Sequence, residues 1–283
     1  MPRSFKQELV GVFGQPVAEN PTQAMIEAAF AAMGLDWRYL TVEVLPADLA
    51  AAVTGSKAMN WRGFNCTIPH KVAVIPLLDL LSPAAAKIGA VNCVINRDGE
   101  LLGENTDGKG FLQSITVVRS VKGANAVILG AGGAARAISV ELALAGASRL
   151  TIVNRDPGRG RTLADLVTME TGVPAIFVPW EGDYHVPATA AILVNATSIG
   201  LFPDVEARVP VAIDSLRPGL LVCDVIPNPP RTRLLKDAES RGCETLDGLG
   251  MLVNQGQIGI RLWTGRDPDP RVMRLALEDV FRS

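Results

Sequence analysis

Residues 125–156 (NAVILGAGGAARAISVELALAGASRLTIVNRD) constrain the fold of this chain more than any other stretch. An apolar run ends at Gly130, a glycine-rich turn follows, and an alanine-rich amphipathic segment leads into a second apolar run. This order predicts a strand, a tight turn, a helix and another strand within about thirty residues. Strands joined through a helix lie parallel in one sheet, so the stretch predicts an α/β fold.

The same alternation of β-rich and Ala/Leu-rich segments continues along the rest of the chain, whose 283 residues suit one large or two ordinary domains. We expect an N-terminal α/β domain over residues 1–107, completed by helices in 240–283, and a Rossmann-like domain over 108–239. The boundary falls near 107–122. Strands are predicted at 8–17, 36–44, 62–68, 90–96, 100–104, 190–198 and 219–226, and helices at 21–34, 46–53, 71–80 and from 247 onward.

Composition excludes several classes of protein. The chain contains no run of eighteen uncharged apolar residues, and its first residues lack the apolar core of a signal peptide, so we expect a cytoplasmic protein. A net charge of −2 gives no footprint for nucleic acid. We expect a small-molecule substrate, no membrane partner, and a monomer or homodimer. The cysteines lie beside apolar runs without CxxC spacing, which predicts small core residues and no metal site, at Cys66, Cys93, Cys223 and Cys243.

The glycine-rich turn predicts nucleotide binding. Gly130 permits the tight turn, Gly132 lets the backbone approach a pyrophosphate, and Gly133 opens a helix whose free N–H groups favour an anion. Ala135 takes the third small position of the fingerprint. The predicted cofactor contacts are Gly130, Ala131, Gly132, Gly133 and Ala134.

The end of the following strand should contact the adenosine ribose. Asn154 stands there, followed by Arg155, Asp156, Arg159 and Arg161. Arginine suits the 2′-phosphate of NADP, which favours NADP. Asp156 could instead accept from the ribose hydroxyls and repel a phosphate, so NAD stays open.

A nicotinamide enzyme that oxidises an alcohol needs a group that takes the hydroxyl proton. The two histidines fit a packed position (His70) and a polar loop (His185), which leaves lysines and carboxylates as candidates, among them Lys71 and Asp107. Alone, Lys71 fits a solvated lysine and Asp107 a helix cap. Together with Asn92, both follow strand-like runs, where α/β proteins gather ligand groups.

In order along the chain, the motifs resemble the shikimate dehydrogenase family, which includes quinate/shikimate dehydrogenases. The resemblance implies a substrate domain completed by C-terminal helices, an NADP domain between them, and Lys71 with Asp107 as the catalytic pair. It also implies substrate contacts from Thr67, Asn92 and Gln255, positions near the nicotinamide at Val225 and Gly248, and an adenosine-phosphate clamp at Arg155 and Arg159. The motifs are GQPVAEN, NCTIPHK, GAVN, GENTDG, GAGGAAR, NRD, VNATSIG and DGLGMLVNQ.

Two positions depart from the family pattern. The family carries two serines that hold a substrate carboxylate, whereas this chain has Asn20 and Thr22, with Glu19 adding negative charge beside them. Pro227 stands where a substrate-contacting tyrosine is common. Because hydrogen-bond donors at these substrate-binding positions differ from those of the family, we expect a different substrate.

The sequence thus favours an NADP-dependent oxidoreductase that interconverts a secondary alcohol and a ketone on a small cyclic polyol acid, with shikimate and 3-dehydroshikimate as the default pair. Quinate or another cyclitol, with NAD in place of NADP, is an alternative. A non-catalytic sensor of a nucleotide or metabolite is the alternative from another class.

Overall fold

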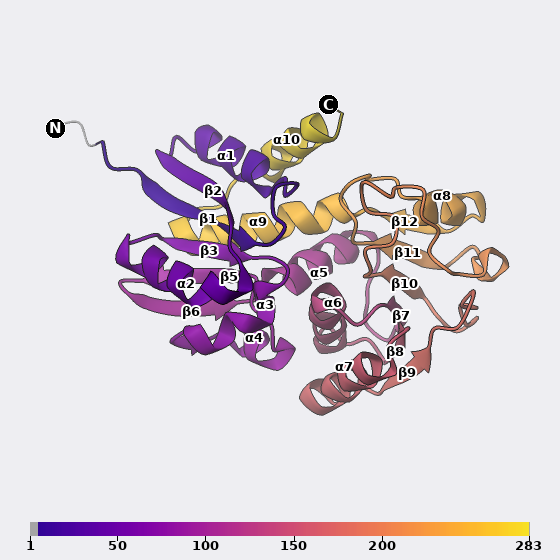
Figure 1. Ribbon diagram of the computed structural model, residues 1–283. Helices are drawn as coiled ribbons and strands as arrows, with labels where there is room; N and C mark the ends of the chain where they lie inside the picture. The colour runs from indigo at the N-terminus through magenta and orange to yellow at the C-terminus, as the bar shows by residue number, and fades with distance from the viewer. Residues whose placement is uncertain (1–4, 283) are drawn as a thin grey trace. The chain divides into compact units, whose positions relative to one another are not determined.

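A computed structural model describes residues 5–282. The chain forms two compact units, each built on its own sheet (Figure 1). The first unit contains the chain up to Thr106 together with Gln255 onward, and the second contains Asp107–Asn254. This is the predicted α/β class, with a mixed sheet in the first unit and a parallel Rossmann-like sheet in the second.

The sheet of the first unit is mixed. Within residues 5–282 it has six strands in the order β2-β1-β3-β5-β6-β4. Strands β1, β2 and β3 run parallel, and β5 is antiparallel to both β3 and β6. The strands are β1 (Glu8–Gly14), β2 (Trp37–Glu43), β3 (Gly63–Cys66), β4 (Leu80–Leu81), β5 (Cys93–Arg97) and β6 (Glu100–Glu104).

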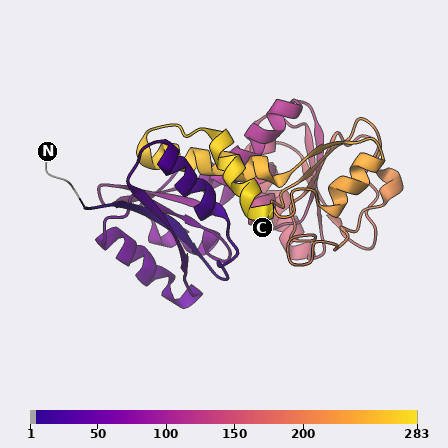
Figure 2. The same ribbon diagram turned by 90° about the horizontal axis from the view of Figure 1, so that it is seen from above.

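The helices of the first unit include a pair formed from distant parts of the chain. Helix α1 packs against α10, the indigo and yellow helices of Figure 2. The predicted return of C-terminal helices to the first domain is therefore confirmed. The helices are α1 (Thr22–Ala32), η1 (Pro46–Asp48), α2 (Leu49–Ala58), α3 (His70–Ala73), η2 (Ile75–Leu77), α4 (Pro83–Ile88) and α10 (Pro270–Arg282).

The sheet of the second unit is wholly parallel in its described residues, in the order β12-β11-β10-β7-β8-β9. Its strands are β7 (Asn125–Leu129), β8 (Arg149–Asn154), β9 (Ala175–Pro179), β10 (Ile192–Asn195), β11 (Leu221–Asp224) and β12 (Glu244–Leu246). The helices are α5 (Thr106–Val118), α6 (Gly133–Leu144), α7 (Pro157–Thr171), η3 (Ile213–Ser215), α8 (Arg233–Ser240) and the first part of α9 (Gly248–Thr264).

Each unit has its own apolar core. In the first, the ring of Phe13 stacks on that of Phe64 at 4.6 Å, with Trp61 tilted beside them. In the second, the central strands contribute fully buried aliphatic side chains such as Leu193 and Val222. All four cysteines are buried, as predicted for small core residues. Burial raises the pKa of the Cys66 thiol to about 12, which keeps it neutral.

Several local predictions are confirmed. Helix α1 begins directly after Pro21, and Gly34 follows its end with φ +65°. Asp98 and Gly99 both have positive φ between antiparallel β5 and β6, as a two-residue hairpin turn requires.

The structure differs from the sequence prediction in the helix after β3 and in the return of the chain to the first domain. The helix predicted over 71–80 is only one turn at α3, because Pro76 lacks an N–H and the backbone tightens into η2 before β4. The return to the first domain was expected near residue 240. Strand β12 still pairs with β11 in the second sheet, and the units divide after Asn254.

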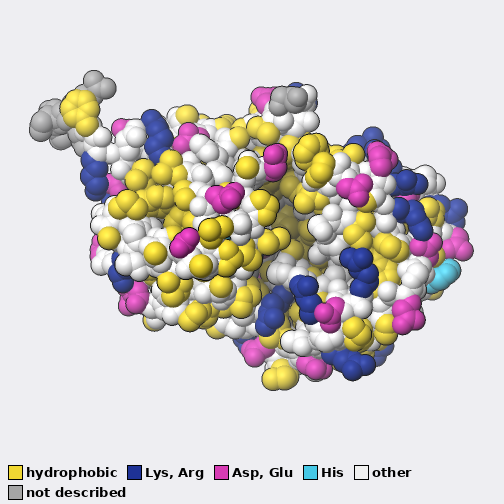
Figure 3. Space-filling view, in the orientation of Figure 1, with side chains coloured by type: hydrophobic (Ala, Val, Ile, Leu, Met, Phe, Trp, Pro, Cys, Tyr) yellow, Lys and Arg dark blue, Asp and Glu magenta, His cyan; other side chains and the backbone are white. Residues whose placement is uncertain are grey.

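The surface shows acidic and basic side chains interspersed over the face seen in Figure 3. Among residues 5–282, no helix is both long and apolar enough to cross a membrane. The same residues contain no group of three or more His, Cys, Asp or Glu side chains that could hold a metal ion.

Candidate active site

The predicted substrate residues of the first unit follow one edge of its sheet. Phe13 of β1 pairs with Cys66 of β3, Asn65 pairs with Cys93 of β5, and Cys93 pairs with Glu104 of β6. Because β5 runs antiparallel, its first residue meets the last residues of its neighbours. The segments that carry Asn20, Thr67 and Thr106 leave the sheet at this end, and the segment that carries Asn92 enters it there.

Lys71 lies in the short helix α3, just after β3. The preceding His70 is fully buried, and its Nε2 lies 2.7 Å from the carbonyl oxygen of Val44, which anchors the helix. The Lys71 carbonyl accepts a hydrogen bond from Val91 N–H at 2.7 Å. Its side chain is half-buried, and its charge partly offsets the effect of burial on the pKa of the Cys66 thiol. The backbone of Lys71 is thus held in place, and its part in catalysis stays a prediction.

Asn92 is tied to the residue that precedes the candidate Asp107. The Thr106 N–H donates to Asn92 Oδ1 at 2.6 Å, and Asn92 Nδ2 donates to Thr106 Oγ1 at 2.9 Å. Thr106 Oγ1 also lies 3.5 Å from Oε1 of Gln255 on α9. Three of the polar positions, two of them predicted substrate residues, thus form one buried cluster in the first unit.

Asp107 is buried at the start of α5, in the second unit. The next residue, Gly108, lies so close to α6 that a Cβ there would meet Glu141 Cγ at 2.6 Å and the Ala137 carbonyl oxygen at 2.7 Å. Only glycine permits this approach, which fixes the first turn of α5 against α6. The pairing of Lys71 with Asp107 in catalysis stays a prediction.

Asn20 and Thr22 form the start of α1. The Thr22 N–H donates to Asn20 Oδ1 at 3.0 Å, and Thr22 is buried. This bond closes an Asx turn around Pro21, which occupies the N-cap position of α1, and the helix has no side-chain cap. The amide oxygen of Asn20 is thereby committed to the helix, whereas Glu19 is exposed.

The glycine-rich loop has the geometry that a pyrophosphate site needs. Gly130 follows β7 with φ +105°, and a Cβ there would lie 3.0 Å from the Ala196 carbonyl oxygen. Apart from Gly132 itself and its chain neighbours, no described atom lies within 4 Å of the Cβ position of Gly132, so a ligand has room beside that backbone. Gly132 caps α6 without any side-chain hydrogen bond, and Ala135 is fully buried. The loop therefore fits a dinucleotide phosphate.

The residues after β8, where the adenosine ribose is predicted to bind, are held by hydrogen bonds at the start of α7. Asp156 caps α7 by accepting from Arg159 N–H at 3.0 Å, and Asn154 Nδ2 donates to the Asp156 carbonyl at 2.8 Å. The guanidinium of Arg161 lies 5.8 Å from the ring centroid of Phe177, and so packs on β9. Arg155 and Arg159 are exposed beside this cap.

The two residues predicted near the nicotinamide lie against each other. A Cβ on Gly248 would be 2.6 Å from the Ile226 carbonyl carbon and 2.7 Å from that of Val225, and closer still to the Ile226 oxygen. The backbone of Gly248 is therefore pressed onto the loop after β11. Asp247 caps α9 by accepting from Leu249 N–H at 3.1 Å.

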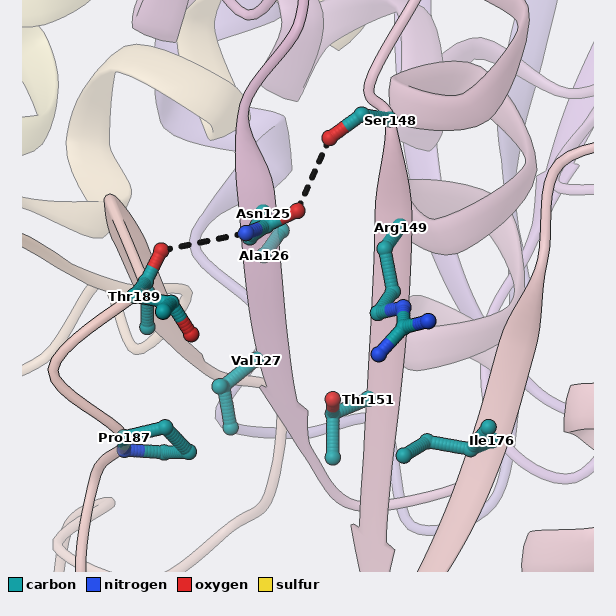
Figure 4. A pocket seen from close by; sticks show the side chains of 10 residues that line it. Asn125, Ala126, Val127, Ser148, Arg149, Thr151, Ile176, Pro187 and Thr189 are labelled. Carbon is teal, nitrogen blue, oxygen red and sulfur yellow. Dashed lines mark hydrogen bonds between the residues drawn. The ribbon is translucent and has the colours of Figure 1, made fainter.

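An open pocket of about 550 Å³ lies elsewhere in the second unit (Figure 4). Val127, Thr151 and Ile176 line it from β7, β8 and β9, and Asn125 bonds to Ser148 and the Thr189 carbonyl. Asn125 and Arg149 begin their strands, so this pocket adjoins the amino ends. None of the predicted site residues lines it.

Comparisons with known proteins agree with these motifs. Residues 12–94 match the family profile "Shikimate dehydrogenase substrate binding domain", and residues 248–278 match "Shikimate 5'-dehydrogenase C-terminal domain". The chain is 45% identical over 277 residues to a shikimate dehydrogenase (NADP(+)) of Moorella thermoacetica, covering 96% of this chain and 93% of the relative.

The chain belongs to the shikimate dehydrogenase family.

Solved structures show the same likeness over nearly the whole chain. A ligand-free 5-ketofructose reductase of Gluconobacter sp. strain CHM43 is 54% identical, with a TM-score of 0.93 and coverage of 98% of this chain and 100% of that one. A shikimate 5-dehydrogenase from Listeria monocytogenes, in complex with shikimate and NAD, is 36% identical with a TM-score of 0.91, covering 97% of each chain.

As a member of this family, the chain is an NAD(P)-dependent dehydrogenase. Membership of a family of dehydrogenases disfavours the alternative hypothesis of a non-catalytic sensor. The second unit fits such a cofactor, since Gly130, Gly132 and the start of α6, which has no side-chain cap, leave space and N–H donors for its phosphates.

Two buried polar residues that support Asn92, Tyr39 and Asn65, were not predicted from the sequence. The buried Tyr39 hydroxyl donates to Asn65 Oδ1 at 2.7 Å, and Asn65 Nδ2 donates to the Asn92 carbonyl at 2.9 Å. Burial raises the pKa of Tyr39 well above its ordinary value, so it stays a neutral donor. An asparagine inside the apolar run GFNC was the available signal.

Proposed function

We propose that this enzyme reduces a small, uncharged polyhydroxylated ketone with NADPH, in a reversible reaction that consumes one proton and yields the alcohol and NADP+. The observation that carries the proposal is the bond of Asn20 to the start of α1, at the position where the family resemblance implies a carboxylate-binding serine. The 54% identity to a 5-ketofructose reductase supports it.

Asn20 suits a hydroxyl better than a carboxylate. A carboxylate offers about four lone-pair sites and needs several donors, and each donor missing in a buried site costs about 1–3 kcal/mol. Asn20 has given its oxygen to Thr22, which leaves only its NH₂ group to face a ligand. The exposed Glu19 next to it repels an anion and not a neutral polyol.

Lys71 and Asp107 carry the proton chemistry in this proposal. The bound cofactor supplies or receives the hydride. In the direction of reduction, the Lys71 ammonium donates a proton to the ketone oxygen as that oxygen becomes a hydroxyl, and in oxidation the neutral amine takes it back. The Asp107 carboxylate orients the ammonium and balances its charge. Asn92, Thr67 and Gln255 bind the substrate hydroxyls.

NADPH is the preferred cofactor in this proposal because Asp156 is occupied in capping α7. Its carboxylate is then directed to a backbone N–H, whereas Arg155 and Arg159 are exposed and can grip a 2′-phosphate in a bidentate manner. The NADP(+)-dependent naming of the relative supports this choice.

The test is a matrix of substrates and cofactors measured by absorbance of the reduced nucleotide. 5-Ketofructose, 3-dehydroshikimate and 3-dehydroquinate are each offered with NADPH and NADH. Asn20→Ser with Thr22→Ser should raise kcat/KM for 3-dehydroshikimate and lower it for the neutral ketone. Gln23→Ser, whose exposed side chain bonds to Thr41 instead, is the matched control and should alter neither.

Shikimate and 3-dehydroshikimate are the second candidate pair, favoured by the 45% identity to the Moorella enzyme. If the wild type prefers 3-dehydroshikimate over 5-ketofructose by tenfold or more in kcat/KM, this pair replaces the neutral ketone. A folded protein that binds NADPH and turns over none of the ketones would refute both.

A further inference from the structure

Asp224 is a buried carboxylate that the proposed chemistry does not use. It is the last residue of β11 and is 1% exposed. Its Oδ1 accepts from Ile226 N–H at 3.1 Å, and its Oδ2 accepts from the Thr232 hydroxyl at 2.8 Å. Asn195 Nδ2 lies 3.1 and 3.2 Å from the two oxygens. Such a buried acid is stable only because these donors surround it.

Asn195 connects Asp224 to the loop after β10 through hydrogen bonds. It is the last residue of β10 and fully buried. Its Oδ1 accepts from the Thr197 N–H at 3.2 Å and the Thr197 hydroxyl at 2.7 Å, and Thr197 Oγ1 in turn accepts from Ile199 N–H. The Asn195 carbonyl accepts from Val225 N–H at 3.1 Å. The two loops are thus bonded together through one amide.

Thr232 connects the same carboxylate to a helix. It is buried and caps α8 by accepting from Leu235 N–H at 3.4 Å. One side chain, that of Asp224, therefore holds three segments: the loop over 196–199, the loop over 225–231 and the start of α8. We call Asn195, Asp224 and Thr232 the carboxyl-edge network.

Both loops of this network touch backbone that is predicted to bind the cofactor. The Cβ position of Gly130 lies 3.0 Å from Thr197 Cγ2 and from the Ala196 carbonyl oxygen. Gly248 is pressed onto the Val225–Ile226 peptide. Strands β7 and β10 are neighbours from which the chain proceeds in opposite directions across the sheet, the place where open α/β sheets bind their ligands.

We propose that Asp224 is a positioning residue for the nicotinamide cofactor. Through Asn195 and Thr232 it holds the loops over 196–199 and 225–231 in the shape that the cofactor binds, without contacting the reacting atoms. The proposal rests on the use of a nicotinamide cofactor by this family and not on which ketone is reduced.

The test measures the Kd of NADPH by calorimetry on the full chain without substrate, alongside KM and kcat for NADPH. Asp224→Asn keeps the size and shape of the side chain but replaces one carboxylate oxygen with an NH₂ group. That NH₂ group would face the donors of Thr232 and Asn195 without an acceptor between them. We expect a Kd and a KM about tenfold higher, with kcat at saturating NADPH changed less than threefold. Combining Asp224→Asn with Asn195→Asp restores an acceptor facing a donor, and should recover at least half of the loss on a logarithmic scale.

Controls separate positioning from general loss of stability. Val222→Ala removes buried volume from the same strand without touching the network, and should lower the melting temperature while leaving the Kd of NADPH within twofold. Thr232→Val deletes one donor and Thr232→Ser keeps it, so the first should weaken NADPH binding and the second should not. If Asp224→Asn fails to fold, the comparison of Thr232→Val with Thr232→Ser tests the proposal in its place.

A wild-type Kd and KM in both Asp224→Asn and Thr232→Val would overturn the proposal, as would an equal rise of the Kd in Val222→Ala. Since the Kd is measured without substrate, failure of the neutral-ketone proposal would not affect it.

Discussion

Replacing Gly248 with alanine tests whether the start of α9 and the loop after β11 form one rigid cofactor surface. The added Cβ would lie 2.6 Å from the Ile226 carbonyl carbon and 2.7 Å from that of Val225, whereas ordinary contact begins near 3.4 Å. The neighbours are backbone, so the loop or the helix start must move by about 1 Å. Overpacking of this kind costs roughly 1–3 kcal/mol.

Two measurements follow for Gly248→Ala. The melting temperature should fall by roughly 2–12 °C, given about 2–4 °C per kcal/mol for large domains. The Kd of NADPH should rise by about tenfold or more, since the displaced Val225–Ile226 peptide belongs to the predicted nicotinamide surface. The KM of the ketone at saturating NADPH should change less.

Gly259→Ala in the same helix is the matched control. The three atoms nearest to its Cβ would be those of the Trp263 ring, at 3.5–3.8 Å, which is ordinary contact, so alanine should raise stability by about 0.5–1 kcal/mol through helix propensity. Gly248→Ala with wild-type melting temperature and wild-type Kd would refute the reasoning.

Three further predictions concern other groups. Lys71→Ala should lower kcat by about 10²–10⁴ while leaving the Kd of NADPH within twofold, and a mutant with wild-type turnover would remove Lys71 from the chemistry. Arg155→Ala with Arg159→Ala should raise the Kd of NADPH at least tenfold and leave that of NADH unchanged; equal losses for both would remove these arginines from 2′-phosphate binding. Burial raises the pKa of Asp224 from 3.8 to about 6, so its native carboxyl keeps a proton that the unfolded chain releases between about pH 4 and 6. The free energy of unfolding should therefore fall as pH rises through that window, on the order of 3 kcal/mol, and level off above it; in urea titrations Asp224→Asn should lack this component, and an unchanged slope would contradict the shift.

The parts of the fold that could be predicted from the sequence depend on local chemistry. The turn at Gly130 needs a positive φ at one residue, and the turn at Asp98-Gly99 needs a positive φ at both residues. Residue types that tolerate a positive φ stand at these positions, so both turns could be predicted from the sequence. The helix α4 was missed although Ser82 and Pro83 carry a local start signal, and Ser82 does accept from Ala85 N–H.

The remaining features depend on contacts between distant residues. The contact of Gly248 with Ile226, the bond of Asn195 to Asp224 and the attachment of Asn92 to Thr106 join side chains or backbone that the sequence does not place together. Strand β12 has three residues, too few for a periodic pattern, and it is recognisable only from its pairing with β11.

The most direct test of the account is kcat/KM for 5-ketofructose and for 3-dehydroshikimate, each with NADPH, in the wild type and in the Asn20→Ser, Thr22→Ser double variant. The wild type should prefer the neutral ketone by at least tenfold, and the double variant should shift that ratio toward the acid by at least tenfold. A wild type that prefers 3-dehydroshikimate, or a ratio that the two serines leave unchanged, would contradict the assignment of substrate class to the start of α1.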